Sequence, residues 1–293
     1  MSDYVLACCA AADVTAEQYE EWGIKCMPYF YKIDDAETED RPEEFDAESF
    51  YGKLDACEIA GTHERSVEEY IDFFRELTAD GKDVVYVTLS SGLGNAYNVA
   101  SGASVILSII NPDVKVYVVD SLCASSGMAL LLDKAVELKN SGMPAAELAE
   151  WINENKLRVN HLFFTYDLSQ FVKTGALADN VATFAKRWEI CPIMNVDSWG
   201  ELVRVGQVRK KEKVFQKAVK MMEKRADDKA SYSGKIYMSD SLCREYALEV
   251  RKLIEERFPN AGEIRMNTIG ATIGAHAGRG TVAVFFWGKE SRS

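Results

Sequence analysis

Two serines and two glycines follow an apolar segment in the loop 88–97, whose sequence is TLSSGLGNAY. The preceding residues 84–89 are predicted to form a strand, and the residues after the loop a helix that extends to about residue 110. In an open α/β sheet, ligands bind at the carboxyl ends of strands, and the unpaired N–H groups of a helix N-terminus favour an anion. Ser90, Ser91 and Gly92 are therefore candidates for holding an anionic head group. The alternative is that Ser90 or Ser91 only caps the helix.

A second candidate is a histidine framed by glycines. Four glycines between residues 270 and 280 surround His276, directly before a final apolar segment. Gly274 and Gly278 allow the backbone to approach a ligand closely, and an imidazole can donate to a carboxylate. A purely structural histidine is the alternative. Thr62 is a third candidate, because its hydroxyl can donate to a ligand or, alternatively, start the following helix.

The elements that position these residues change character along the chain. Strands are predicted at residues 4–9, 24–33, 84–89 and 114–119, and helices at 15–22, 66–80 and 122–141. This alternation predicts an N-terminal, three-layer, mainly parallel α/β domain over residues 1–158. Further strands are predicted at 162–166, 193–196, 202–205, 235–238, 264–268 and 281–287. Their irregular alternation with helices predicts a C-terminal α+β domain over residues 159–293, with a more antiparallel sheet.

A basic amphipathic helix is predicted at about residues 207–226. Lysines 210, 213, 217, 220 and 224 follow one face, and Val214, Ala218, Met221 and Met222 line the other. This stripe is either a solvated surface or a face that steers an acidic partner. The acids at 34, 35, 37, 39 and 40 are interpreted as a solvated insertion.

The charge distribution excludes some classes of function. The net charge is −12, and residues 1–80 alone carry 22 acidic and 6 basic side chains. General nucleic-acid binding needs a basic footprint, so it is not expected. No apolar run approaches the length that spans a bilayer, no secretory signal pattern is evident, and the seven cysteines contain no CxxC pair. We therefore expect a cytoplasmic protein with reduced thiols and no stable membrane insertion.

In their order and separations, the three segments resemble the DegV family. Thr62 follows an acidic insertion, as a threonine does there, and residues 90–97 resemble the family's SSGLSGTY-like loop. Residues 119–121 resemble its VDS segment, and residues 273–281 its IGxHxGPGT-like signature. The likeness extends from Tyr4 through Gly288.

The resemblance implies a two-domain bacterial carrier, not itself an enzyme, with a long-chain fatty acid buried between or beside the domains. It assigns the carboxylate to Thr62, Ser91 and His276, supported by Ser90, Gly92, Gly274 and Gly278. It also implies a separate ATP-dependent fatty acid kinase as partner, docked near Lys173, Arg209 and Lys210. Candidates for the acyl tunnel, each of which could equally be ordinary core, are Phe163, Phe164, Phe184, Trp188, Ile190 and Ile193.

This chain departs from the family pattern at four places. Residues 9–11 are Cys-Ala-Ala in place of a DST-like triplet, although Asp13 remains. Residues 62–65 keep only the threonine of a TSQP-like segment, and residues 94–96 replace SGT by Gly-Asn-Ala. Residues 173–176 lack the second basic residue of a GGR-like turn associated with partner engagement, so we expect weaker kinase coupling.

Other functions use the same residue types. Ser90 or Ser91, Asp120 and His276 are the types of a hydrolase triad, but no G-x-S-x-G elbow occurs. A phosphate-handling subunit related to dihydroxyacetone-type kinases would use loop 88–97 as a phosphate cradle, and it is the principal alternative. Three histidines, none at ligand spacing, predict no metal, and the lack of a P-loop or G-x-G-x-x-G predicts no other cofactor.

Overall fold

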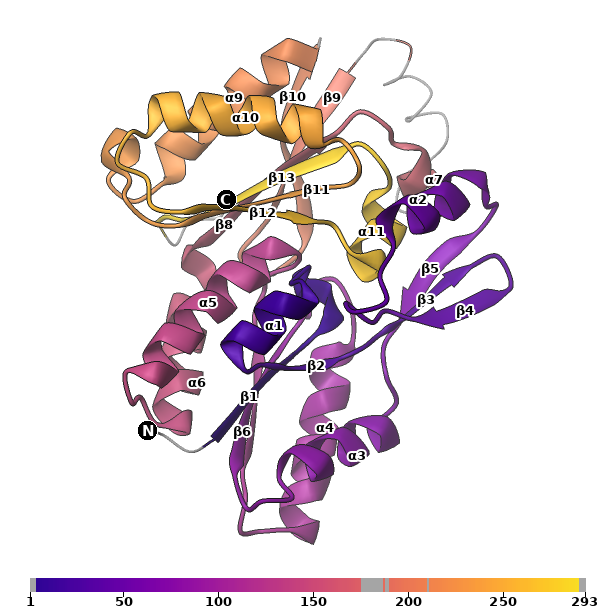
Figure 1. The fold of residues 1–293 in the computed structure, drawn as a ribbon, viewed down its shortest axis with the longest axis vertical. Coiled ribbons are helices and arrows are strands. Elements are labelled where there is room, and N and C mark those ends of the chain that lie inside the picture. Colours follow the sequence, from indigo (N-terminus) through magenta and orange to yellow (C-terminus); the bar gives the residue numbers. More distant parts are fainter. Residues whose placement is uncertain (1–3, 175–186, 188–189, 210, 290–293) are drawn as a thin grey trace.

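The computed structural model describes residues 4–174, 187, 190–209 and 211–289, which contain two large sheets and one small sheet (Figure 1). The first sheet has the order β2-β1-β6-β7 and is parallel throughout. Its strands are β1 (Tyr4–Cys9), β2 (Lys25–Met27), β6 (Asp83–Thr88) and β7 (Val116–Asp120). β1 and β6 are buried along almost their whole length, as expected for central strands of a sheet that is covered on both faces.

Five helices accompany this sheet: α1 (Ala16–Trp22), α3 (Val67–Leu77), α4 (Ala96–Ile110), α5 (Ser126–Asn140) and α6 (Ala145–Asn155). In Figure 1, α3 and α4 lie on one side of the strands, and α5 and α6 on the other. Thr15 and Ser66 begin α1 and α3 with capping boxes, in which side chain and backbone bond reciprocally. Short 3-10 segments occur at Ala10–Ala12, Lys156–Arg158 and Lys229–Ser231.

The second sheet has six strands in the order β10-β9-β8-β13-β11-β12. They are β8 (Val159–Thr165), β9 (Ile190–Val196), β10 (Leu202–Arg209), β11 (Ile236–Asp240), β12 (Ile264–Thr268) and β13 (Thr281–Trp287). Only the β11–β12 pairing is parallel among those of the described strands of this sheet. The predicted fold class, a parallel α/β part followed by an α+β part, is confirmed; the division at residues 158 and 159 stays a prediction.

The two faces of this second sheet meet different neighbours because side chains alternate along a strand. Leu162, Phe164 and Val284 share a core with side chains of α9 (Lys211–Arg225) and α10 (Arg244–Arg257). Phe163 and Phe285 belong to the opposite face, where they pack with the core of the parallel sheet and α5. Through that second face and α5, the second sheet joins the parallel part. None of the helices in the described ranges is long and apolar enough to cross a membrane.

A small antiparallel sheet, β4-β3-β5, projects from the parallel part. It consists of β3 (Phe30–Ile33), β4 (Ala36–Glu39) and β5 (Ala60–His63), and α2 (Ala47–Ala56) connects β4 to β5. Its core joins aromatic side chains of α2 to alanines of α11 (Ala271–Ala277). The short helix α7 (Ser169–Lys173) lies beside α11. Residues from both ends of the sequence therefore meet here.

Three predicted elements differ from the structure. Residues 24–33 are not one strand: β2 and β3 belong to different sheets, and between them Pro28 accepts a hydrogen bond from Arg65 Nε at 2.7 Å while Tyr29 is buried. Residues 207–209 are not helical but continue β10, paired with residues 190–192 of β9, so the basic helix begins at Lys211. Residues 122–125 precede α5 as a loop, with positive φ at Leu122 and Ser125.

Candidate functional site

A cavity of about 220 Å³ lies where the carboxyl ends of the parallel strands face the second sheet. Its walls are mostly apolar and come from both parts of the chain. The principal apolar side chains are Leu89, Leu93, Phe163, Phe171, Ile273 and Phe285. Such a lining, whose accessible area is mainly apolar although several polar side chains contribute to it, is typical of a pocket for an apolar ligand.

Two of the three predicted carboxylate ligands lie side by side in the lining of this cavity, and the part around them is called its polar end. Thr62 in β5 and His276 in the last turn of α11 both line it, and Thr62 Oγ1 lies 2.8 Å from His276 Nε2. His276 is partly open to solvent and counts as exposed. The protein packed around the rest of the imidazole disfavours its charged form and lowers the pKa of His276, while the Glu64 carboxylate opposes this shift. A neutral imidazole has one donor and one acceptor nitrogen. The pair can therefore bond to a head group that donates or accepts.

Helix α11 is held in place by side chains from distant segments. Asp40 Oδ2 accepts from Thr272 N at 2.8 Å and from Thr272 Oγ1 at 2.6 Å. Tyr51 Oη donates to Ile269 O at 2.9 Å, just before the helix, and Gln170 Nε2 donates to Ala275 O at 2.6 Å. Helix α11, which carries His276, has only seven residues, and these bonds fix its position.

Gly274 explains how closely α11 approaches α2. A Cβ at this position would lie 2.5 Å from Tyr51 Oη and 2.9 Å from Phe50 Cε1. Gly278, at φ 70°, ends the helix in a conformation that favours glycine, and its Cβ would lie 2.8 Å from Gln170 Cβ. Gly274 and Gly278, two of the three predicted supporting glycines, thus have a packing or conformational role next to His276.

The polar groups of the serine loop are used in hydrogen bonds within the loop and to neighbouring segments of the protein. Ser90 is buried and its Oγ donates to Gly200 O at 2.8 Å, in the turn between β9 and β10. Ser91 N donates to Asp120 Oδ1 at 3.1 Å, and Gly92 N donates to Ser90 Oγ at 3.2 Å. Gly92 is required because a Cβ there would lie 2.6 Å from the Gly200 carbonyl.

Ser91 itself is exposed and is not among the residues that line the cavity. Its assignment to a ligand carboxylate stays a prediction. The hydrolase candidates are engaged separately, since Asp120 accepts from the amides of Ser91 and Leu122 and His276 bonds to Thr62. Within the described ranges, no group of three or more His, Cys, Asp or Glu side chains is arranged to hold a metal ion.

The other predicted residues divide between cavity, core and surface. Phe163 lines the cavity, whereas Phe164 and Ile193 belong to the core under α9. Ile190 is half-buried at the start of β9 and is not among the cavity-lining residues. Phe184 and Trp188 lie outside the described residues, as does Lys210. Lys173 Nζ donates to Leu54 O at 2.9 Å and so anchors the end of α2, and Arg209 is exposed at the end of β10.

Several cavity residues were not predicted from the sequence. His161 in β8 lines the cavity and stacks edge-on against Phe285, with ring centroids 5.3 Å apart. His161 and Phe163 are two residues apart in one strand, so their side chains lie on the same face, and this spacing can be seen in the sequence. Glu64 and Ser125 also line the cavity. Ser125 donates to Asp13, and Asp13 Oδ1 accepts from Gly270 N at 2.8 Å, which joins the parallel part to the segment before α11.

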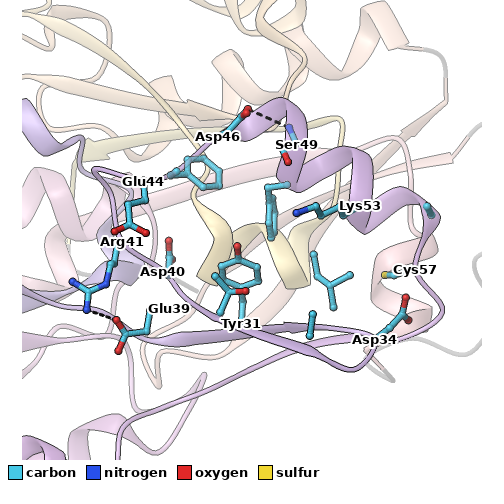
Figure 2. A pocket seen from close by; sticks show the side chains of 16 residues that line it. Tyr31, Asp34, Glu39, Asp40, Arg41, Glu44, Asp46, Ser49, Lys53 and Cys57 are labelled. Carbon is cyan, nitrogen blue, oxygen red and sulfur yellow. Dashed lines mark hydrogen bonds and ion pairs between the residues drawn. The ribbon is translucent and has the colours of Figure 1, made fainter.

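A second, larger cavity of about 500 Å³ lies between the β3–β4 hairpin and α2 (Figure 2). Its lining includes five acidic side chains and two basic ones: Asp34, Glu39, Asp40, Glu44, Asp46, Arg41 and Lys53. Figure 2 shows the ion pair of Arg41 with Glu39 at one end of the view and Asp34 with Cys57 at the other. The interpretation of the acids at 34, 35, 37, 39 and 40 as a solvated insertion is wrong for Asp40, which is buried and accepts a hydrogen bond from Thr272. This charged lining is unsuited to an acyl chain.

Comparisons with known proteins agree with this architecture. The family model described as "Uncharacterised protein, DegV family" matches residues 10–289. A DegV domain-containing protein of Clostridium perfringens is 28% identical over 289 residues, which cover 98% of each chain. The solved structure of a DegV lipid-binding protein from Thermotoga maritima superposes with a TM-score of 0.84 at 21% identity, covering 99% of this chain and 100% of the other.

A further solved structure is that of the fatty acid kinase (Fak) B3 protein of Streptococcus pneumoniae, loaded with linoleic acid. It is also similar with a TM-score of 0.84 at 21% identity, and it covers 99% of this chain and 100% of its own. Since the family model spans nearly the whole sequence and includes all three predicted head-group segments, the chain belongs to the DegV family.

Proposed function

We propose that this protein binds a long-chain fatty acid, with the acyl chain in the apolar cavity and the carboxylate at Thr62 and His276. The observation that carries the proposal is the pairing of an apolar lining with a hydroxyl–imidazole pair at one end. The Thermotoga protein is described as a lipid-binding protein and the Streptococcus protein was solved loaded with linoleic acid, and both descriptions support the proposal. Each methylene taken out of water contributes about 0.8 kcal/mol, so a long chain favours a closed cavity.

The size of the cavity bears on how the ligand enters. At about 220 Å³ it is smaller than the roughly 300–1,000 Å³ of ordinary ligand sites. Binding of a full-length acyl chain therefore requires lining side chains to move apart. Chain length and saturation preference depend on that movement, and we expect acids of roughly 14–18 carbons, the range that the family resemblance implies together with the methylene arithmetic.

Extraction of the purified protein under denaturing conditions, followed by mass spectrometry, tests this proposal. We expect a saturated or monounsaturated fatty acid to be released. Recovery of water-soluble phosphoesters alone would instead support the phosphate-handling subunit, and turnover of an acyl ester by the pure protein would support the hydrolase.

Substitution of Thr62 tests the head-group assignment. Thr62→Val removes one donor and should weaken fatty-acid binding by about 1–3 kcal/mol, because a charged acceptor is left short of a hydrogen bond. Thr38→Val, in the charged cavity of Figure 2, is the matched control and should bind as the wild type does. Ser91→Ala tests the remaining assignment; unchanged affinity would leave Ser91 as a loop residue.

We further propose that the protein presents its ligand to a separate ATP-dependent kinase. The fatty acid kinase system named for the Streptococcus protein supports this, as does the basic face of α9. Lys213, Lys217, Lys220 and Lys224 are exposed there, while Val214, Ala218 and Met222 are buried. Because electrostatic steering acts mainly on association rate, charge reversal at Lys213 and Lys217 should slow association at low salt without changing the bound lipid. Reversal at Lys25 and Lys115, also exposed, is the control; equal rates for both variants would contradict the docking face.

A further inference from the structure

Glu64 places a carboxylate at the polar end of the apolar cavity. It follows β5 directly and lines the same cavity as Thr62 and His276. Its Oε1 accepts from Asn95 N at 2.8 Å, and Asn95 is the N-cap of the 15-residue helix α4. The next residue back, Gly94, has no side chain, and any Cβ there would collide with Glu64 Oε1. The chain thus brings its own carboxylate to the helix N-terminus that faces the cavity.

The neighbouring cations are engaged elsewhere. Arg65 donates to Glu39 at 2.6 Å and to Glu69 at 2.7 Å, and His63 Nε2 lies 2.7 Å from Glu37 Oε2. Among the described residues, Glu64 forms no ion pair. Its carboxylate accepts from the backbone amide of the α4 N-cap. It also opposes the lowering of the pKa of His276 that burial causes.

A ligand carboxylate bonded to Thr62 and His276 would share this end of the cavity with the Glu64 carboxylate. Two carboxylates in one partly buried site repel each other, and the neutral imidazole does not compensate the second charge. An uncharged head group with an O–H has no such repulsion and can donate to Glu64.

We propose, resting on the function proposed above, that Glu64 determines the head-group charge that this cavity accepts. It holds the anion position at the N-terminus of α4 and so favours acyl ligands with an uncharged, hydrogen-bond-donating head group, such as a long-chain alcohol or the undissociated acid, over the carboxylate form. Glu64 thereby weakens binding of the anionic fatty acid relative to a chain with a neutral residue at this position.

Binding of dodecanoic acid and dodecan-1-ol to delipidated full-length protein at pH 8, measured by displacement of a fluorescent acyl probe, tests this proposal. Glu64→Gln is the informative variant because its amide oxygen can still accept from Asn95 N while the charge is removed. We expect it to bind the acid about tenfold or more tightly than wild type, since a like charge has been removed. Its affinity for the alcohol should stay within about threefold of wild type. Glu76→Gln, an exposed position on α3, changes net charge equally and should leave both affinities unchanged.

The outcomes separate the two proposals. If the acid binds Glu64→Gln and wild type equally, or binds the variant more weakly, Glu64 does not select head-group charge, and the fatty-acid function stands. If wild type binds neither the acid nor the alcohol, the cavity is not an acyl site, and both proposals are overturned. Circular dichroism of each variant verifies that it is folded.

Discussion

Replacement of Asp13 by asparagine should remove a pH dependence of stability that is built into the contact between the two sheets. Asp13 is 6% exposed and connects three segments. Its Oδ1 accepts from Gly270 N at 2.8 Å, its Oδ2 bonds to Ser125 Oγ, and its backbone carbonyl accepts from Asn267 Nδ2 at 2.9 Å. Burial raises the pKa of Asp13 to about 7, against the lowering effect of the hydrogen bonds from Ser125 and Gly270. Asparagine resembles the protonated carboxyl, because it offers one acceptor and one donor.

The direction and size of the effect follow from proton linkage. Unfolded, an aspartate releases its proton near pH 4, whereas folded Asp13 holds its proton up to about pH 7. The folded state therefore binds more protons between these values, and the free energy of unfolding falls as pH rises through this window. A raised pKa of this size corresponds to about 4 kcal/mol in total, at about 1.4 kcal/mol per pKa unit. About 2.5 kcal/mol of that should be lost between pH 5 and pH 8.

Urea unfolding of delipidated protein, followed by tryptophan fluorescence at several pH values, measures this loss. The useful quantity is the free energy of unfolding of wild type minus that of Asp13→Asn, because groups common to both cancel. We expect this difference to fall by about 2.5 kcal/mol from pH 5 to pH 8, so that the variant becomes the more stable protein at high pH. Asp80→Asn, at an exposed position, should give no such trend. A difference for Asp13→Asn that is flat, or that rises with pH, would refute the reasoning.

Two further substitutions test how α11 is positioned. Gly274→Ala should lower the free energy of unfolding by about 1–3 kcal/mol, because its Cβ collides with Tyr51 and Phe50, and should weaken acyl-ligand binding through His276. The control is Gly52→Ala in α2, where an added Cβ meets nothing within 4 Å. Equal melting temperatures for the two variants would show that the contact of Gly274 relaxes freely. Asp40→Ala removes the acceptor for Thr272 N and Oγ1 and should cost about 1–3 kcal/mol in thermal or urea denaturation. Asp40→Asn keeps an acceptor and should cost less, so a larger loss for asparagine than for alanine would contradict the role of this bond.

The sequence is a good guide to elements whose pattern is local. Strands β12 and β13 lie at the predicted residues, because each is an apolar or alternating segment between turn-forming residues. The boundaries between elements were harder to predict. The change of sheet between β2 and β3, at Pro28, depends on buried Tyr29, whose hydroxyl lies 3.1 Å from that of Tyr70 in α3. The continuation of β10 to Arg209 depends on pairing with β9.

The candidate site likewise contains residues that could be predicted from the sequence and residues that could not. Thr62 and His276 could be proposed from residue type and from glycine spacing, and the structure brings them to 2.8 Å. Asp13, Asp40 and Glu64 could not, because their contacts with Gly270, Thr272 and Asn95 join positions far apart in the chain. Acidic side chains in an acidic segment look solvated until the partner from the other end of the sequence is known.

The pairing of Thr62 with His276 joins positions 214 residues apart, and this has a consequence for the order of events during biosynthesis. At roughly 5–20 residues per second, a ribosome needs on the order of 10–40 s to reach His276 after Thr62 has been added. Throughout that interval the β6–α4 loop and Leu93 lack the α11 and β13 residues that complete the cavity walls. The nascent chain can therefore hold no acyl ligand in the proposed manner until β13 has been made. Loading has to follow the synthesis of β13, and Phe163, Phe171 and Phe285 gain their mutual cover only after Phe285 has been added.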